Sequence, residues 1–150
     1  MMRHLDFPPV WLAAFIFGVW LWQAMGLPGS VQPGSLLRLA GVLLVGLGAG
    51  LMGLAVVALA QARTTVVPHR VPSALVTGGI FRLSRNPIYL GDVLGLVGAA
   101  LWLGAPGALV LVPGLIWCLT VRFIQPEEAR MQATFGAAYD SYAARTRRWV

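Results

Sequence analysis

Long apolar stretches alternate with short polar segments along the chain, and this pattern predicts membrane-spanning helices. The apolar stretches cover about residues 10–25, 36–60, 89–103 and 107–124. The stretch at 36–60 is long enough to cross a bilayer core of roughly 30 Å with some tilt. The stretch at 89–103 is shorter, and we expect it to form a helical hairpin with the next one through the turn Gly104-Ala105-Pro106. The predicted fold class is therefore all-α, a polytopic membrane protein with about four transmembrane helices.

The first apolar stretch, residues 10–25, has two interpretations. Its basic start and apolar body fit a signal peptide. However, no small-x-small cleavage site follows it, and Trp11, Trp20 and Trp22 lie near its two ends, where tryptophan anchors a helix at the membrane interface. We therefore expect a retained span.

The second stretch is rich in glycine. Gly46-x-x-x-Gly50 has the small-xxx-small spacing that lets a second helix approach closely. Glycine is also simply tolerated in membrane helices, so the sequence leaves packing and tolerance as equal alternatives.

Two polar segments flank the predicted hairpin. The connector at residues 61–88 contains Pro68 and Pro72, which discourage a continuous helix. Residues 127–148 place an apolar stripe at helical spacing, namely Met131, Phe135, Tyr139 and Tyr142. This stripe predicts a C-terminal amphipathic helix that lies at the membrane surface, with Gly136 as a candidate interruption. All 150 residues are treated as one domain.

Composition and charge support the membrane assignment. The chain is 58% hydrophobic and 11% charged, whereas a soluble domain is about 45–50% apolar and about 25% charged. The net charge is +6 and every basic residue is arginine. Because these arginines flank apolar stretches, anionic lipid headgroups explain them, and we expect no nucleic-acid partner.

The arginines also predict an orientation. With four spans, the side that holds both termini and the connector receives nearly all of them, whereas the other side receives only Arg38. The positive-inside rule therefore places both termini and the connector in the cytoplasm.

Cysteine and histidine offer no metal chemistry. Cys118 stands alone inside an apolar stretch, and we expect a buried, inert thiol. His4 and His69 lie far apart in the sequence, and no cluster has the spacing of a metal site.

The connector is the first candidate for ligand binding. Gly78-Gly79 permits positive φ and close backbone approach, and Phe81 and Tyr89 offer aromatic faces. Arg85 can bind a carboxylate through two N–H groups, and Asn86 both donates and accepts, just before Pro87 begins the next helix. The alternative is a turn with basic membrane flanks, and composition alone favours that alternative.

Four further charged residues are candidates on the same membrane face. Glu127 and Glu128 follow Pro126 and either contact a ligand or complement the dipole at a helix start. Asp92 lies one turn into the third apolar stretch and is a candidate for the substrate site, or else complements the helix dipole or pairs with Arg85 or Arg122. Arg122, near the end of the last span, is the second candidate for contacting the substrate.

Several of these motifs occur together in order. LVTGGIFRLSRNPIYLG is followed, after the hairpin, by PEEARMQATFGAAYDSYAARTRRW. This combination resembles the isoprenylcysteine carboxyl methyltransferase and phospholipid methyltransferase superfamily, whose members are integral membrane enzymes that use S-adenosylmethionine. The resemblance covers the chain from about Thr64 onward.

The resemblance implies a set of cofactor-contacting residues. These are Leu75, Val76, Phe81, Asn86, Pro87, Ile88 and Tyr89 in the connector, with Glu127 as the matching glutamate. Gly78 and Gly79 lie where the phospholipid branch has its glycine motif. Together with Arg85 and Glu128, these residues form our predicted binding site for S-adenosylmethionine, whose sulfonium, ribose, adenine and amino-acid groups suit aromatic rings, a carboxylate, an amide and an arginine.

The acceptor stays open at this level. The resemblance implies methyl transfer to a lipophilic or lipid-linked molecule, either the carboxylate of an isoprenylcysteine or the amine of phosphatidylethanolamine. Asn86 stands where the isoprenylcysteine branch usually has histidine, and Arg122 is out of strict register with that branch's substrate arginine. Candidate bases are few, namely His69, Asp92 and the two glutamates, and this scarcity slightly favours an acceptor that needs none. The alternative from another class is a non-catalytic membrane assembly protein.

Overall fold

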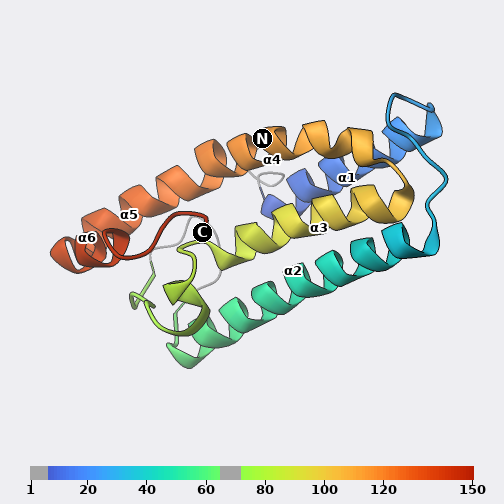
Figure 1. Cartoon of the computed structure of the whole chain (residues 1–150). Helices are drawn as coiled ribbons and strands as arrows, with labels where there is room; N and C mark the ends of the chain where they lie inside the picture. Colours follow the sequence, from blue (N-terminus) through green and yellow to red (C-terminus); the bar gives the residue numbers. More distant parts are fainter. Residues whose placement is uncertain (1–6, 65–71) are drawn as a thin grey trace.

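The computed structural model describes residues 7–64 and 72–150, and this part of the chain is helical with no β-strand. The predicted all-α fold class is confirmed. The α-helices are α1 (Pro8–Ala24), α2 (Ser35–Gln61), α3 (Pro87–Leu103), α4 (Leu111–Leu119), α5 (Gln125–Phe135) and α6 (Ala137–Ala143). Two 3₁₀ turns, η1 (Gly79–Arg82) and η2 (Pro106–Val110), and a π-helical turn, η3 (Thr120–Ile124), complete the chain (Figure 1). The predictions that concern His4, Pro68 and His69 lie outside the described residues.

The helices coincide with the predicted apolar stretches and have two lengths. Two helical runs, Ser35–Gln61 and Pro106–Phe135, are long and apolar enough to cross a membrane. α1 and α3 have 17 residues each, which is roughly 26 Å at 1.5 Å per residue. Large apolar side chains such as Leu36, Leu43 and Trp117 are exposed on the outside of the bundle. A hydrocarbon surrounding accounts for these side chains, as expected for a membrane protein.

Helix α3 packs most extensively on α2 and also contacts α1 and α4 (Figure 1). Glycines make the α2–α3 approach possible. A Cβ atom on Gly41 would lie 2.6 Å from the carbonyl oxygen of Gly98, and one on Gly48 would lie 2.7 Å from that of Gly91. The residue numbers of the two pairs run in opposite directions, as antiparallel helices require.

The small-xxx-small pair singled out in the sequence does not make this contact. A Cβ atom on Gly46 or on Gly50 would meet no atom within 4 Å among the described residues. The packing residues are Gly41 and Gly48, which are seven apart and therefore lie on one helix face. The sequence pattern alone could not separate the two faces, because both carry glycine.

The predicted turn between the third and fourth apolar stretches is confirmed. Gly104 caps α3 in the left-handed conformation, with φ of 77°, which glycine adopts without steric cost. Its carbonyl accepts a hydrogen bond of 2.8 Å from the backbone N–H of Val31, which ties this turn to the α1–α2 connection.

From η2 to Phe135 the chain is one continuous helical run, and its π-helical turn lies directly before Pro126. Proline cannot donate the backbone hydrogen bond that a regular helix needs, and here the helix continues through Pro126 with the π-helical turn ending two residues before it. Glu127 and Glu128 therefore do not lie at a free helix start, and the dipole explanation for this pair loses its basis.

The C-terminal region differs from the predicted single helix over 127–148. Gly136, with φ of 50°, separates α5 from α6, and α6 ends at Ala143. The predicted apolar stripe is present, but it packs against the protein. Tyr139 and Tyr142 are buried in a cluster with Ala55 and Phe81, and Met131 and Phe135 pack on this cluster. The stripe therefore covers the connector and the end of α2 rather than a lipid surface.

Candidate functional site

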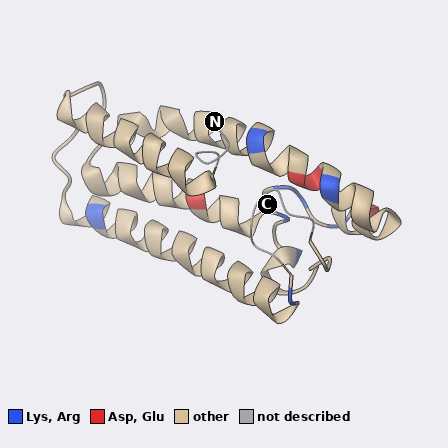
Figure 2. Cartoon of the chain, turned by 180° about the vertical axis from the view of Figure 1, so that it is seen from behind, with Lys and Arg blue, Asp and Glu red and all other residues tan. Residues whose placement is uncertain are grey.

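Charged side chains gather at the end of the bundle that holds α5, α6 and the C-terminus, whereas α1, α2 and α3 are largely uncharged (Figure 2). At this end the structure has a cavity of about 420 Å³, within the range of about 300–1,000 Å³ typical of small-molecule sites. Its walls come from the N-terminal end of α1, the last turns of α2, the connector, the start of α3, and helices α5 and α6.

The connector is fixed by the C-terminal segment, which lies more than 60 residues away in sequence. Arg85 donates its backbone N–H to the carbonyl of Arg147 at 3.0 Å. Asn86 donates its side-chain amide to the carbonyl of Arg148 at 3.0 Å, and Ser84 donates its hydroxyl to the same carbonyl at 3.3 Å. Because Ser84 and Asn86 are buried, these hydrogen bonds hold the backbone that lines the cavity in one conformation.

Glu128 links the connector, α5 and the C-terminal segment. Arg148 binds it through two charge-assisted hydrogen bonds, Nε to Oε1 at 3.0 Å and Nη2 to Oε2 at 2.6 Å. Arg85 approaches the same carboxylate with Nη2 at 3.3 Å. The hydrogen bond to Glu128 raises the pKa of Arg148 above its usual value. We expected Arg85 to bind the carboxylate of a ligand. In the structure, the carboxylate of Glu128 already occupies one of its N–H groups.

Glu127 faces a different neighbour. Its Oε2 atom accepts a hydrogen bond of 3.2 Å from the hydroxyl of Tyr89, which stands at the start of α3. The ring of Tyr89 also stacks on Phe123 of the π-helical turn, with centroids 6.3 Å apart. Glu127 and Tyr89 thus form one polar wall of the cavity, supported from behind by an aromatic side chain.

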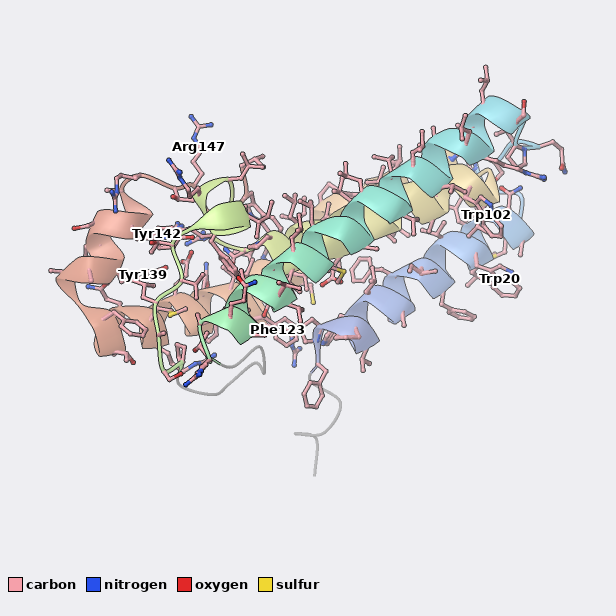
Figure 3. The ribbon with its side chains drawn as sticks, turned by 90° about the horizontal axis from the view of Figure 1, so that it is seen from below. Trp20, Trp102, Phe123, Tyr139, Tyr142 and Arg147 are labelled. Atoms are coloured by element: carbon pink, nitrogen blue, oxygen red, sulfur yellow. The ribbon has the colours of Figure 1, made fainter. Side chains whose placement is uncertain are left out.

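Two tyrosines of α6 close the cavity from the far side. Arg85 donates from Nη1 to the hydroxyl of Tyr139 at 3.2 Å, and Tyr142 donates its hydroxyl to the carbonyl of Phe81 at 2.6 Å. Figure 3 shows both tyrosines at the end of the molecule opposite to Trp20 and Trp102, with Arg147 pointing away from the bundle. Burial raises the pKa of Tyr142 to about 12, so its phenol is neutral at physiological pH.

Asp92 lies one turn further along α3 than Tyr89 and also lines the cavity. Its side chain is 1% exposed, and neither carboxylate oxygen has a hydrogen-bond partner among the described residues. The two arginines that the sequence offered as partners lie elsewhere: Arg85 binds Glu128, and Arg122 lies over the ring of Trp11 at 4.7 Å from its centroid.

The remaining wall is apolar. Met52, Val56 and Leu59 line it from α2, and Phe7, Pro8 and Pro9 line it from the start of α1. Val56 and Phe7 are 44% and 41% exposed, so this wall continues to the outside of the bundle between the two helices. The cavity therefore joins a charged, hydrogen-bonding half to an apolar half whose lining includes partly exposed side chains of α2 and of the residue before α1.

The structure brings most of the predicted site residues to this cavity. The cavity-lining members are Val76, Phe81, Arg85, Asn86, Pro87, Ile88, Tyr89, Asp92, Glu127 and Glu128. Four predicted residues do not line it. Leu75 packs in the Phe81 cluster, Gly78 and Gly79 are exposed on the outer side of η1, and Arg122 is exposed beside Trp11. Gly79 has the expected positive φ of 57°, but this conformation turns the chain into η1 and does not bring its backbone to the cavity.

Sequence reasoning missed residues from three places. Tyr139, Tyr142 and Met131 line the cavity, and their stripe was the available signal, although it was assigned to the lipid surface. Arg148 was among the arginines that we attributed to lipid headgroups, and nothing in the neighbouring sequence indicates a contact with Glu128. The apolar wall from α1 and α2 had no signal at all, because its lining residues are ordinary apolar ones.

A helical membrane protein with a partly charged, partly apolar cavity is the class that this fold and site define. A sequence model of the phospholipid methyltransferase family matches residues 36–138, which is more than half of the chain. The chain belongs to this family, and the resemblance recognised in the sequence is confirmed.

Curated relatives agree with the family. The chain is 30% identical over 105 residues to a probable protein-S-isoprenylcysteine O-methyltransferase of Oryza sativa subsp. indica, covering 69% of this chain and 55% of the relative. It is 35% identical over 69 residues to protein-S-isoprenylcysteine O-methyltransferase A of Arabidopsis thaliana, covering 46% and 35%. The chain spans about half the length of the rice relative. No solved structure gives a significant match.

Proposed function

We propose that this protein is an integral membrane methyltransferase that transfers a methyl group from S-adenosylmethionine to a lipophilic or lipid-linked acceptor. The observation that carries the proposal is the single cavity in which a charged half, built from the connector and α5, meets an apolar half that opens between α1 and α2. Membership of the phospholipid methyltransferase family supports the same reaction class.

The charged half fits S-adenosylmethionine. The Nε atom of Arg85 is buried and has no hydrogen-bond partner among the described residues, which leaves a donor for the carboxylate of the cofactor's amino-acid group. Glu127 is suited to the ribose hydroxyls, and Phe81, Tyr139 and Val76 offer apolar and aromatic surface for the adenine. When bound, S-adenosylmethionine supplies a methyl group activated by its sulfonium. The task of the protein is then chiefly to hold the two reactants in line and to exclude water.

The apolar half is suited to the acceptor. Met52, Val56 and Leu59 on α2 continue from the cavity to an exposed apolar helix surface, so a lipid chain can remain in the membrane while its reactive group reaches the charged half. The carboxylate of an isoprenylcysteine-like molecule and the amine of phosphatidylethanolamine both satisfy this arrangement.

We further propose four spans with both termini on the cytoplasmic side. Arg63 directly follows α2 and Arg82 lies in η1, whereas Arg38 lies in the first turn of α2, at the other end of that helix. Figure 2 shows most of the basic segments gathered at the end of the bundle that holds α5, α6 and the C-terminus. This asymmetry supports a cytoplasmic cavity by the positive-inside rule. A cofactor from the cytosol and an acceptor from the bilayer would then enter from different directions.

Isothermal titration with S-adenosylhomocysteine tests the proposal. We expect the purified protein in lipid nanodiscs to bind it with one site, and Asn86→Ala and Glu127→Gln to weaken binding while the thermal transition remains cooperative. Asp140→Asn is the matched control, because Asp140 is exposed on α6, does not line the cavity, and accepts a hydrogen bond of 3.0 Å from the side chain of Gln132.

Two results would contradict the proposal. Absence of binding in both nanodiscs and detergent would remove the methyltransferase assignment and favour a non-catalytic assembly protein. Unchanged affinity in both site variants would leave the reaction class standing but remove this cavity as the cofactor site.

A further inference from the structure

Asp92 is the one feature of the cavity that the proposed cofactor site does not explain. Burying a carboxylate without a hydrogen bond is strongly unfavourable, and an ionisable residue within a span indicates function by default. The α3 dipole does not account for it, because Asp92 is the sixth residue of α3 and the effect is confined to the first turn. Pairing among the described residues does not account for it either, since Arg85 and Arg122 are engaged elsewhere.

The position of Asp92 indicates which ligand it faces. The residues suited to the cofactor, Arg85, Asn86 and Tyr89, lie before it in the connector and the first turn of α3. Asp92 is one turn further along α3 and lines the same cavity as the apolar residues Met52 and Val56 of α2. It therefore lies where the charged half meets the apolar half, which is where the reactive group of a membrane-anchored acceptor arrives.

We propose that Asp92 accepts the proton of the methyl acceptor, and that the acceptor is a nucleophile that carries a proton, an amine in the first instance, rather than a carboxylate. This inference rests on the proposed function. A protonated amine supplies both the hydrogen-bond donor and the positive charge that the buried carboxylate lacks. An acceptor carboxylate would instead bring a second negative charge beside the first and would have no proton to give up.

The chemistry balances with the groups named. The ammonium group of the acceptor donates one proton to the Asp92 carboxylate, and the nitrogen regains its lone pair. This pair forms the new N–C bond as the C–S bond of the sulfonium breaks, and the bonding electrons stay on sulfur. The methylated amine carries the positive charge that the sulfonium has lost, and Asp92 returns its proton to water.

Among the described residues, the ionisable side chains that line the cavity together with Asp92 are Arg85, Tyr89, Glu127, Glu128, Tyr139 and Tyr142. Tyr89 on α3 and Glu127 on α5 line the same cavity and are hydrogen-bonded to each other. The residues of α1 are all uncharged, and the single charge of α2, Arg38, lies in its first turn at the far end of the bundle. Glu127 is the carboxylate that could also cause a pH dependence of the rate. The pH profile of an Asp92 variant should therefore be compared with that of a Glu127 variant.

The test uses Asp92→Asn, which keeps the size of the side chain and removes its capacity to take a proton. The full chain in nanodiscs is given S-adenosylmethionine with a labelled methyl group, with phosphatidylethanolamine or a farnesylated cysteine as acceptor. We expect label in the amine lipid, and a rate at neutral pH lowered by about 100-fold or more in Asp92→Asn, the usual contribution of a general base. The affinity for S-adenosylhomocysteine should not change. The variant should regain rate as the pH rises, because the amine then loses its proton to the solvent, and Asp92→Glu should recover part of the rate at neutral pH.

Three results would overturn this inference while leaving the proposed function intact. The first is an Asp92→Asn rate equal to that of the parent and of the Asp140→Asn control. The second is label only on the farnesylcysteine carboxylate, in parent and variant alike. The third is weaker binding of S-adenosylmethionine but not of S-adenosylhomocysteine, because Asp92 would then face the sulfonium. A parent protein that binds neither nucleoside overturns the proposed function and this inference together.

Discussion

The two adjacent glutamates of α5 have different neighbours, and substitution of Glu128 should therefore affect stability more than ligand binding. Glu128→Gln keeps the shape of the side chain but removes the charge that holds Arg148 at 2.6 and 3.0 Å and Arg85 at 3.3 Å. Both arginines would then lack their counter-charge, and the C-terminal segment would lose its main side-chain attachment to α5.

The magnitude follows from burial. Breaking a fully buried ion pair costs about 3–5 kcal/mol, whereas an exposed pair contributes about 0.2–1 kcal/mol. The side chains of Arg85 and Glu128 are 16% and 18% exposed, and that of Arg148 is 37% exposed, so this cluster lies between the two limits. We expect a loss of about 2 kcal/mol, which for a chain of this size lowers Tm by about 4–8 °C.

Thermal unfolding of the detergent-solubilised protein measures this loss, with Asp140→Asn as the control for removing a carboxylate. Arg148→Lys should give a smaller decrease, because lysine cannot make the two parallel hydrogen bonds of a guanidinium. At a temperature where all variants are folded, Glu128→Gln should bind S-adenosylhomocysteine better than Glu127→Gln does. An unchanged Tm in Glu128→Gln together with lost binding would refute the reasoning and make Glu128 the cofactor carboxylate.

Two further predictions concern packing and the tyrosine that closes the cavity. Gly48→Leu should destabilise the protein by about 1–3 kcal/mol, because the new side chain meets the α3 backbone. Gly46→Leu is the control and should not destabilise it, because its side chain points into open space. Equal melting temperatures of the two variants would contradict the α2–α3 packing described above. Tyr142→Phe removes the donor to a buried carbonyl and should cost about 1–3 kcal/mol, measured by thermal unfolding. Burial raises the pKa of Tyr142 from 10.0 to about 12, so its stabilising contribution is complete below pH 10 and is lost as the pH rises toward 12. Tyr142→Phe should remove that alkaline loss, and a loss of the same size in the variant would assign it to another group.

Much of the fold could be predicted because its causes are local. Four apolar stretches became α1, α2, α3 and the run from η2 to η3, because a helix satisfies the hydrogen bonds of its backbone within the segment itself. Gly104 ended α3 for an equally local reason, its ease at positive φ. Which glycines of α2 pack was not local, because only the position of α3 separates Gly48 from Gly46.

The site could be predicted in part for the same reason. Residues 85–89 and the two glutamates are recognisable because they crowd polar and aromatic groups between apolar stretches, and ten of the predicted residues do line one cavity. Gly78, Gly79 and Arg122 carry equally suggestive chemistry, but the direction in which η1 and η3 turn them is decided by packing. The apolar stripe of α5 and α6 was visible in the sequence, yet periodicity does not tell a lipid surface from a protein surface.

The sequence by itself determined the class of this protein and the candidate residues for its site, because apolar length, charge asymmetry and motif order are properties of the chain. Only the tertiary structure decided which partner each charged side chain has. It assigned Glu128 to Arg148 and Arg85, placed Glu127 beside Tyr89, and left the oxygens of Asp92 without a hydrogen-bond partner among the residues that it describes. The physical reason is that a buried charge is defined by its neighbours, and these neighbours come from segments as far apart as α1, the connector and the last residues of the chain.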